Sequence, residues 1–196
     1  MPITIFVFIC TFFEYNRAHG ETQVENEYEM SKQNLVEDIA LILITKYGSD
    51  NPPPYLLVGH SLGGALTVHC CHYVKKNDSN QDVMILPSIV GICVIDVVEG
   101  TALNSLIFMH SIINQRPKTF DTIENAIQYC VSGGMIHNAK SAVLSVPSMF
   151  MLNEKTQKYE WRTQVLKTEP YWKDWFTGLS ELFLKAPVAR LLLLAG

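Results

Sequence analysis

The stretch that decides the fold is YLLVGHSLGGALTVH, residues 55–69, where a short apolar run leads into a serine flanked by glycines. Residues 55–58 are typical of a short buried strand. The residues after Ser61 have the apolar pattern of a helix, which we expect to run to about Lys76. Ser61 is therefore predicted to lie on a sharp strand-to-helix turn, where a serine can serve as a nucleophile.

The segment GHSLG, residues 59–63, fits the pattern G-x-S-x-G of such turns. We expect Gly59 and Gly63 to be needed because strand and helix approach closely beside the serine. The turn lifts the hydroxyl of Ser61 above the sheet edge. The helix N-terminus then offers the backbone N–H of Leu62 as the first donor to a developing oxyanion. An incidental glycine-rich turn is the alternative interpretation.

A serine nucleophile needs a base, and the base needs an acid that orients it. Asp96 ends the apolar run GICVID, residues 91–96. A carboxylate at the end of a core strand is poorly explained by packing. We therefore expect Asp96 to be the triad acid. A helix cap or a loop anchor is the alternative. Glu99 is the lesser candidate for the acid and is interpreted as a loop or binding residue.

The base is harder to place. After Asp96 the chain contains only His110, in a predicted helix, and His137, in a predicted loop. Neither follows a late strand, where the histidine of such a triad is expected. His60 belongs to the nucleophile turn, but strand-turn alternation directs its side chain away from the serine. We therefore expect no triad histidine in this chain and place the base beyond Gly196.

Two other clusters have simpler interpretations. HCCH, residues 69–72, suggests zinc, but consecutive helical residues fan out by about 100° each and cannot converge on one metal. We expect neither a metal nor an organic cofactor. A group of aromatic residues is interpreted as core and helix packing: Trp161, Tyr171, Trp172, Trp175 and Phe176.

Charge and cysteine content limit the class of protein. The formal net charge of the 196 residues is −4 and no block of like charge occurs, which favours neither nucleic acid nor an anionic membrane surface. The five cysteines are odd in number and form no C-x-x-C pair, so we expect a reducing compartment.

The N-terminal run, residues 3–13, is predicted to be a buried strand. A signal or anchor segment remains an alternative, as does a variant start. No Lys or Arg precedes Arg17, and the run is too short to span a bilayer.

Strands and helices alternate along the chain, which predicts a single α/β domain with a mostly parallel sheet and helices on both faces. Ser31 is expected to cap a helix that reaches Tyr47. The other predicted elements are a buried strand at 88–98, helices at 101–113 and 171–184, a strand at 159–165 and a last buried strand at 189–196. About residues 100–158 are expected to form a helical insertion, or lid, over the carboxyl ends of the strands.

Several stretches together resemble the protein phosphatase methylesterase family. GHSLGG alone is common to many lipases and esterases, whereas IDVVEGTA and RPKTF with NAI are distinctive. The matching stretches are HGET (19–22), PPPYLLVGHSLGGALTVH (52–69), GICVIDVVEGTALNSL (91–106), RPKTFDTIENAIQY (116–129) and WRTQVLKTEPYWKDWFTGLSELFL (161–184).

The resemblance implies an α/β-hydrolase that removes the methyl ester from the carboxyl-terminal leucine of the protein phosphatase 2A catalytic subunit. It implies Ser61 as nucleophile and Asp96 as acid, direct binding of the phosphatase, and a cytosolic or nuclear location. The family's early strands, its glycine-rich HGGG-type loop and its histidine segment are not found in residues 1–196. We therefore expect an incomplete domain with activity near background. A non-catalytic phosphatase-binding fragment and a generic lipase or esterase are the alternatives.

Overall fold

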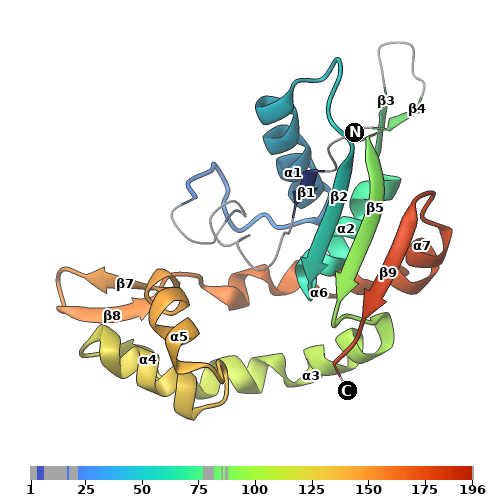
Figure 1. Cartoon of the computed structure of the whole chain (residues 1–196). Coiled ribbons are helices and arrows are strands. Elements are labelled where there is room, and N and C mark those ends of the chain that lie inside the picture. The colour runs from blue at the N-terminus through green and yellow to red at the C-terminus, as the bar shows by residue number, and fades with distance from the viewer. Residues whose placement is uncertain are drawn as a thin grey trace.

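The fold is built on a parallel sheet of four strands (Figure 1). The computed structural model of the protein describes residues 4–6, 17, 22–76, 82–84, 86 and 88–195. The strands lie side by side in the order β1 (Thr4–Phe6), β2 (Tyr55–His60), β5 (Ile89–Ile95) and β9 (Ala189–Leu193). All neighbouring strands are parallel. The predicted α/β class with a mostly parallel sheet is confirmed.

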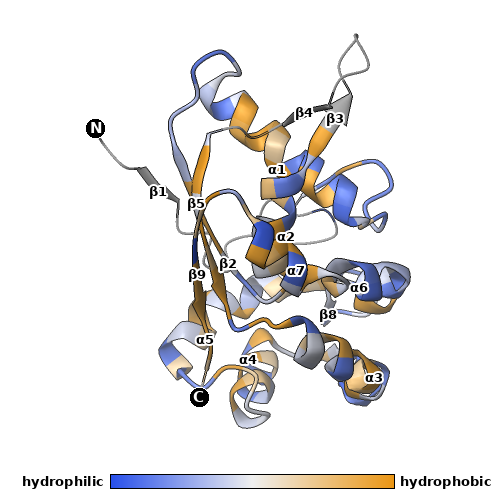
Figure 2. Cartoon of the chain, turned by 90° about the vertical axis from the view of Figure 1, so that its right-hand side faces the viewer, coloured by the Kyte–Doolittle hydropathy of each residue, from blue (hydrophilic) through white to orange (hydrophobic). Residues whose placement is uncertain are grey.

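The first helix begins and ends where the sequence indicated. In α1 (Lys32–Tyr47), the Ser31 side chain accepts the N–H of Asn34 at 3.2 Å, and Gly48 ends the helix with φ 80°. The sequence predicts helices on both faces of the sheet, but the helices of the described residues cover one face. Figure 2 shows α1, α2 (Leu62–His72) and α7 (Leu179–Lys185) on the same side of the sheet.

The helix after Ser61 is shorter than predicted. It ends at His72, and β3 (Val74–Lys76) pairs antiparallel with β4 (Asp82–Met84) instead of continuing the helix. The aromatic and β-branched pair Tyr73 and Val74 favours an extended backbone, which explains the early end. Residues 77–81 of the predicted polar loop lie outside the described residues.

The predicted aromatic-rich helix at 171–184 is two helices, α6 (Glu169–Phe176) and α7. Gly178 separates them with a left-handed backbone, φ 77°. The Glu99 carboxylate holds the start of α7, because it accepts the N–H of Gly178 at 2.7 Å and of Ser180 at 3.0 Å. Glu99 is thus a capping residue between two segments far apart in the sequence.

We expect Glu99→Gln to lower the Tm at pH 7 by a few degrees. The N–H groups of Ser180 and Gly178 lower the pKa of Glu99 below its ordinary value of 4.5. A carboxyl group whose pKa is lower in the folded state than in the unfolded state stabilises the fold at pH values above its unfolded-state pKa. This stabilisation is lost as the pH falls through the folded-state pKa. When thermal unfolding is measured from about pH 7 to pH 3, the Tm values of the unchanged protein and of Glu99→Gln should therefore converge in acid.

Glu124→Gln, which removes an exposed carboxylate with no hydrogen-bond partner among the described residues, is the control. An equal Tm difference at every pH would contradict this role.

The last strand, β9, was predicted to be buried, and this is wrong. All five of its residues are exposed, with Leu191 at 51% and Leu193 at 46%. Among the described strands β9 pairs only with β5, so it forms an edge of the sheet. An apolar run is typical of an interior strand of a parallel sheet, and the sequence does not show that β9 has only one neighbour among the described strands.

The segment between β5 and α6 forms a second body beside the carboxyl ends of the strands (Figure 1). It consists of α3 (Glu99–Gln115), β6 (Thr119–Phe120), α4 (Ile123–Ser132), α5 (Ala139–Ser145), η2 (Pro147–Met149), β7 (Phe150–Asn153), β8 (Lys158–Trp161) and η3 (Val165–Thr168). Its own core contains Phe120, Ala126, Cys130, Ala142, Val146 and Phe150. The predicted strand at 159–165 ends at Trp161. Assignment of this segment as a lid stays a prediction.

At the N-terminus, the described part of the predicted strand 3–13 is β1, which pairs with β2 from Thr4 opposite Tyr55 to Phe6 opposite Leu57. The rest of that stretch lies outside the described residues. No helix within the described ranges is both long enough and apolar enough to cross a membrane.

Candidate active site

Ser61 lies on a strained turn between β2 and α2. Its backbone has φ 52° and ψ −121°, a conformation that costs a non-glycine residue about 1–3 kcal/mol. The surrounding backbone holds it there: its N–H donates to Ile95 O at 3.0 Å, and its carbonyl accepts the N–H of Ala65 at 3.1 Å. The Ser61 side chain makes no capping hydrogen bond to α2. Ser61 is also exposed, so its side chain is accessible at the turn.

The glycines around Ser61 have different roles. A Cβ on Gly59 would lie 2.1 Å from Gly63 O, and one on Gly64 would lie 2.8 Å from Val97 Cγ1. A Cβ on Gly63 would meet no atom within 4 Å. Gly59 is thus required by close approach, as expected. We also expected Gly63 to be needed for close approach, and this is wrong. The backbone of Gly63 faces Gly59, whereas a side chain on Gly63 would meet open space. The second tight position is Gly64.

Leu62 is the first residue of α2, so its N–H has no acceptor within the helix. The positive end of the helix dipole lies at the same point. This is the geometry expected of an oxyanion donor, and that role of Leu62 stays a prediction.

Asp96 follows β5 just as Ser61 follows β2. His60 lies opposite Ile95 in the two paired strands, so the serine and the aspartate come next on neighbouring strands. Asp96 also has a left-handed backbone, φ 53°, and its Oδ1 accepts the N–H of Ala195 at 3.2 Å. Two of the four described non-glycine residues with positive φ are thus Ser61 and Asp96. The left-handed backbone at both strand ends makes this edge of the sheet the candidate site, and its function stays a prediction.

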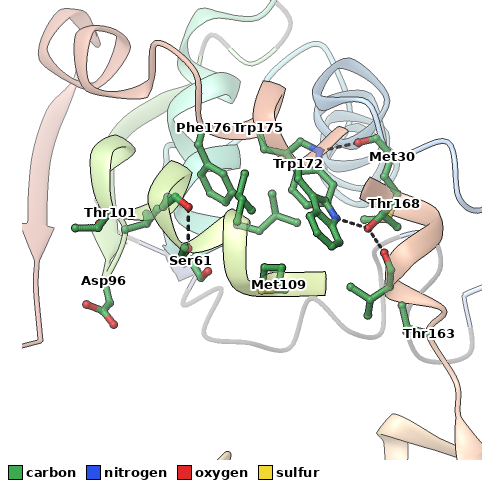
Figure 3. A pocket seen from close by; sticks show the side chains of 16 residues that line it. Met30, Ser61, Asp96, Thr101, Met109, Thr163, Thr168, Trp172, Trp175 and Phe176 are labelled. Atoms are coloured by element: carbon green, nitrogen blue, oxygen red, sulfur yellow. Dashed lines mark hydrogen bonds between the residues drawn. The ribbon is translucent and has the colours of Figure 1, made fainter. Parts of the chain in front are cut away.

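Both side chains line one pocket of about 560 Å³. Figure 3 shows Ser61 between Asp96 on one side and the aromatic side chains of α6 on the other. Polar side chains lie on both sides of the pocket, with Asp96 and Thr101 near Ser61 and Thr163 and Thr168 beyond Trp172 (Figure 3). The remaining wall is mostly apolar, with Met30, Leu62, Val97, Ala102, Leu106, Met109, Val165, Trp172, Trp175 and Phe176. A mostly apolar cavity with an exposed serine at its wall suits a ligand with an apolar side chain next to a reactive polar group.

Sequence reasoning assigned the aromatic residues of 161–176 to packing alone. Trp172, Trp175 and Phe176 are buried as expected, but they also form the pocket wall opposite Asp96. Hydrogen bonds fix both indoles, from Trp172 Nε1 to Thr168 Oγ1 at 2.8 Å and from Trp175 Nε1 to Met30 O at 2.7 Å. No sequence signal separates a wall-forming aromatic residue from a core one, because both are buried.

No histidine is among the described residues that line this pocket. The ring of His110 lies outside it, where Nε2 contacts Glu169 Oε1 at 2.5 Å and bridges α3 to α6. His137 is exposed in the loop before α5. His60 precedes Ser61 and is exposed, but it is not among the lining residues. The position of the triad base stays a prediction.

The HCCH segment packs α2 against the helices beside it. His69 Nε2 hydrogen-bonds Trp175 O at 2.9 Å, and His72 Nε2 hydrogen-bonds Leu182 O at 2.8 Å. Burial raises the pKa of the Cys70 thiol, and it raises that of Cys71 to about 11, so both stay protonated at neutral pH. Within the described ranges no three His, Cys, Asp or Glu side chains form a group that could hold a metal ion.

Several known proteins with similar sequences are named protein phosphatase methylesterase 1. The chain is 37% identical to protein phosphatase methylesterase 1 of Homo sapiens over 221 aligned residues, which cover 92% of this chain and 54% of that protein. It is 41% identical to the Yarrowia lipolytica protein of that name and 39% identical to that of Schizosaccharomyces pombe, again over 92% of this chain. Those matches cover 41% and 50% of the two fungal proteins. The chain thus spans about half the length of the curated relatives it matches. No protein-family model matches the chain.

Solved structures with a similar fold are hydrolases. E-2-(acetamidomethylene)succinate hydrolase superposes with a TM-score of 0.64 at 18% identity, covering 90% of this chain and 59% of that one. An esterase of Mycobacterium tuberculosis gives 0.59 at 15% identity, covering 89% and 55%. An alpha/beta hydrolase of Novosphingobium aromaticivorans gives 0.53 at 12% identity, covering 89% and 68%. At these identities the likeness concerns the fold alone. The chain is therefore related by sequence to the protein phosphatase methylesterases over 92% of its length, and it has the fold of an α/β-hydrolase.

Proposed function

We propose that the complete protein carrying this sequence is a serine carboxylesterase that removes the methyl ester from the carboxyl-terminal leucine of the protein phosphatase 2A catalytic subunit. The observation that carries the proposal is the strained turn of Ser61 at the wall of a mostly apolar pocket. The name shared by the relatives supports the substrate class. The apolar wall formed by Leu106, Met109 and Trp172 suits a leucine side chain beside the scissile ester.

In the proposed mechanism, Ser61 Oγ attacks the ester carbonyl carbon while its proton passes to the base. The N–H of Leu62 stabilises the negative oxygen of the tetrahedral intermediate. The intermediate collapses to an acyl-enzyme as the leaving methoxide takes the proton and departs as methanol. Water then attacks the acyl-enzyme, which frees the leucine carboxylate and restores the Ser61 hydroxyl. Asp96 orients the base and stabilises its cationic form.

The substrate class can be tested by comparing two kinds of ester. We expect kcat/KM of the complete protein to be at least about 100-fold higher for a peptide ending in leucine methyl ester than for short-chain acyl esters, since the peptide fills the apolar pocket and presents its carboxyl end. A preference for short-chain acyl esters would instead favour a generic lipase or esterase.

A second candidate function is phosphatase binding without catalysis by the 196-residue chain. Two observations favour it: no histidine lines the pocket among the described residues, and α3 exposes large apolar side chains, with Ile107 at 75% and Phe108 at 63%. This chain should then co-precipitate the phosphatase catalytic subunit while it hydrolyses its methyl ester at the background rate. Co-precipitation no greater than that of an unrelated protein would exclude it.

We also propose a cytosolic or nuclear location. The four described cysteines, Cys70, Cys71, Cys93 and Cys130, are buried as free thiols, which supports a reducing compartment.

A further inference from the structure

A second pocket, of about 380 Å³, lies beside the first and is lined by cations. We call it the basic pocket. It lies between the end of α3, the end of β8 and η3, and the two pockets share Thr163 and Val165 as wall residues. Its cationic side chains are Arg116, Lys118 and Lys167. A ligand that leaves the first pocket along this wall therefore enters a positively charged one.

Arg116 is the most constrained of these cations. Its guanidinium lies over the Trp161 ring, 5.1 Å from the ring centroid, and the indole N–H donates to Pro117 O at 2.7 Å. Its Nε is shielded from solvent and has no hydrogen-bond partner among the described residues. Most buried polar groups in proteins are hydrogen-bonded, so an exception of this kind requires an explanation. The planar guanidinium fork matches a carboxylate better than any other side chain does.

The other two cations of the basic pocket are lysines. Lys118 is exposed, and Lys167 Nζ lies 4.7 Å from the centroid of the Tyr28 ring. Neither lysine pairs with a carboxylate within the described part of the chain. The one acidic residue of the lining is Glu160, whose Oε1 accepts a hydrogen bond from Asn153 Nδ2 at 2.8 Å. Three cations against one carboxylate leave the pocket with a positive charge that the fold does not neutralise.

We propose that the basic pocket binds an acidic side chain of the same peptide whose esterified carboxyl end reaches Ser61. This inference rests on the proposed function and adds to it a specificity determinant upstream of the ester. An extended peptide advances about 3.4 Å per residue, and the pockets share a wall, so the acidic side chain belongs to one of the residues just before the terminal leucine. Arg116 and Lys118 belong to RPKTF, residues 116–120, a segment that supplies no residue to the proposed esterase mechanism.

The test is a peptide-binding scan with the complete protein carrying Ser61→Ala, so that the ester survives. Fluorescent hexapeptides ending in leucine methyl ester carry one glutamate or one glutamine at each upstream position in turn. We expect glutamate to lower the Kd about 5- to 20-fold relative to glutamine at one or two neighbouring positions, and this preference to shrink at high ionic strength. Peptides with glutamate elsewhere should bind like their glutamine counterparts.

Variants locate the effect. Lys118→Gln and Lys167→Gln change exposed side chains, so both should fold, and each should reduce the glutamate preference at least about twofold without changing the Kd of the glutamine peptides. Arg116→Gln should abolish the preference. Glu160→Gln should increase it, since it removes the one opposing charge. Lys140→Gln, an exposed lysine on α5 that lines neither pocket, should leave it unchanged.

The outcomes separate the two proposals. Equal binding of glutamate and glutamine peptides at every position would overturn the basic pocket while leaving the esterase proposal intact. The basic-pocket proposal would also be overturned if Lys140→Gln reduced the glutamate preference as much as Lys118→Gln and Lys167→Gln do. The effect would then depend on the net charge of the protein and not on this pocket. Binding of no methyl-ester peptide would instead count against the proposed function itself.

Discussion

Ser61→Ala in the complete protein should lower kcat for the leucine methyl ester by about 10⁴- to 10⁶-fold, because removing the nucleophile of a serine triad removes the whole covalent route. The change deletes one exposed hydroxyl that makes no capping hydrogen bond, so the fold should not suffer. Alanine also relieves none of the backbone strain at φ 52°, since it carries a Cβ as serine does. The loss should therefore appear in kcat, with the free energy of unfolding nearly unchanged.

Ser111→Ala is the matched control. Ser111 lies on α3, where its hydroxyl accepts a hydrogen bond from Gln115 at 2.9 Å, and it lines neither pocket. The kcat of Ser111→Ala should stay within about threefold of that of the unchanged protein. Methanol release is measured for both variants. A Ser61→Ala protein that keeps a tenth or more of the rate, a barrier change of about 1.4 kcal/mol or less, would exclude Ser61 as the nucleophile.

Gly59→Ala should destabilise the fold by about 3 kcal/mol or more, whereas Gly63→Ala should change it by less than about 1 kcal/mol. The added Cβ at Gly59 would lie 2.1 Å from a backbone oxygen that cannot move without shifting the start of α2. At Gly63 the added Cβ meets open space, and alanine is a better helix former than glycine. The two positions belong to the same five-residue motif and receive the same substitution, so each serves as the control for the other.

Urea unfolding followed by circular dichroism gives the free energy of unfolding of both variants. A Gly59→Ala protein as stable as Gly63→Ala would mean that strand and helix do not approach at this turn as described. Since the same turn sets the backbone of Ser61, such a result would also remove the structural argument for the nucleophile.

Much of the site was predictable because it depends on local chemistry. The turn at Ser61 and the end of β5 at Asp96 follow from apolar runs that stop at polar residues, and the parallel pairing of β2 with β5 then places both at one sheet edge. The capping of α1 by Ser31 is equally local. The turn, the strand end and the helix cap each depend on residues close together in the sequence, and the pairing of β2 with β5 follows from the alternation of strands and helices.

The features that were missed depend on contacts between distant residues. Glu99 caps a helix about 80 positions later, which no local pattern shows, and Gly178 splits the predicted helix at that cap. Exposure of β9 depends on the number of its neighbours, not on its composition. Arg116 meets Trp161 only because the chain returns through β8. In each case the deciding residue lies in another part of the chain.

The central claim is that Ser61 carries the acyl group of the substrate, and mass spectrometry of the trapped acyl-enzyme tests it most directly. The complete protein is mixed with a peptide ending in leucine methyl ester, quenched in acid within the first turnover and digested. We expect the fragment that contains Ser61 to gain the mass of the peptide ester minus methanol, with the peptide joined to Ser61 Oγ. An acyl group on any other residue, or steady release of methanol with no acylated fragment in the Ser61 region, would contradict the account.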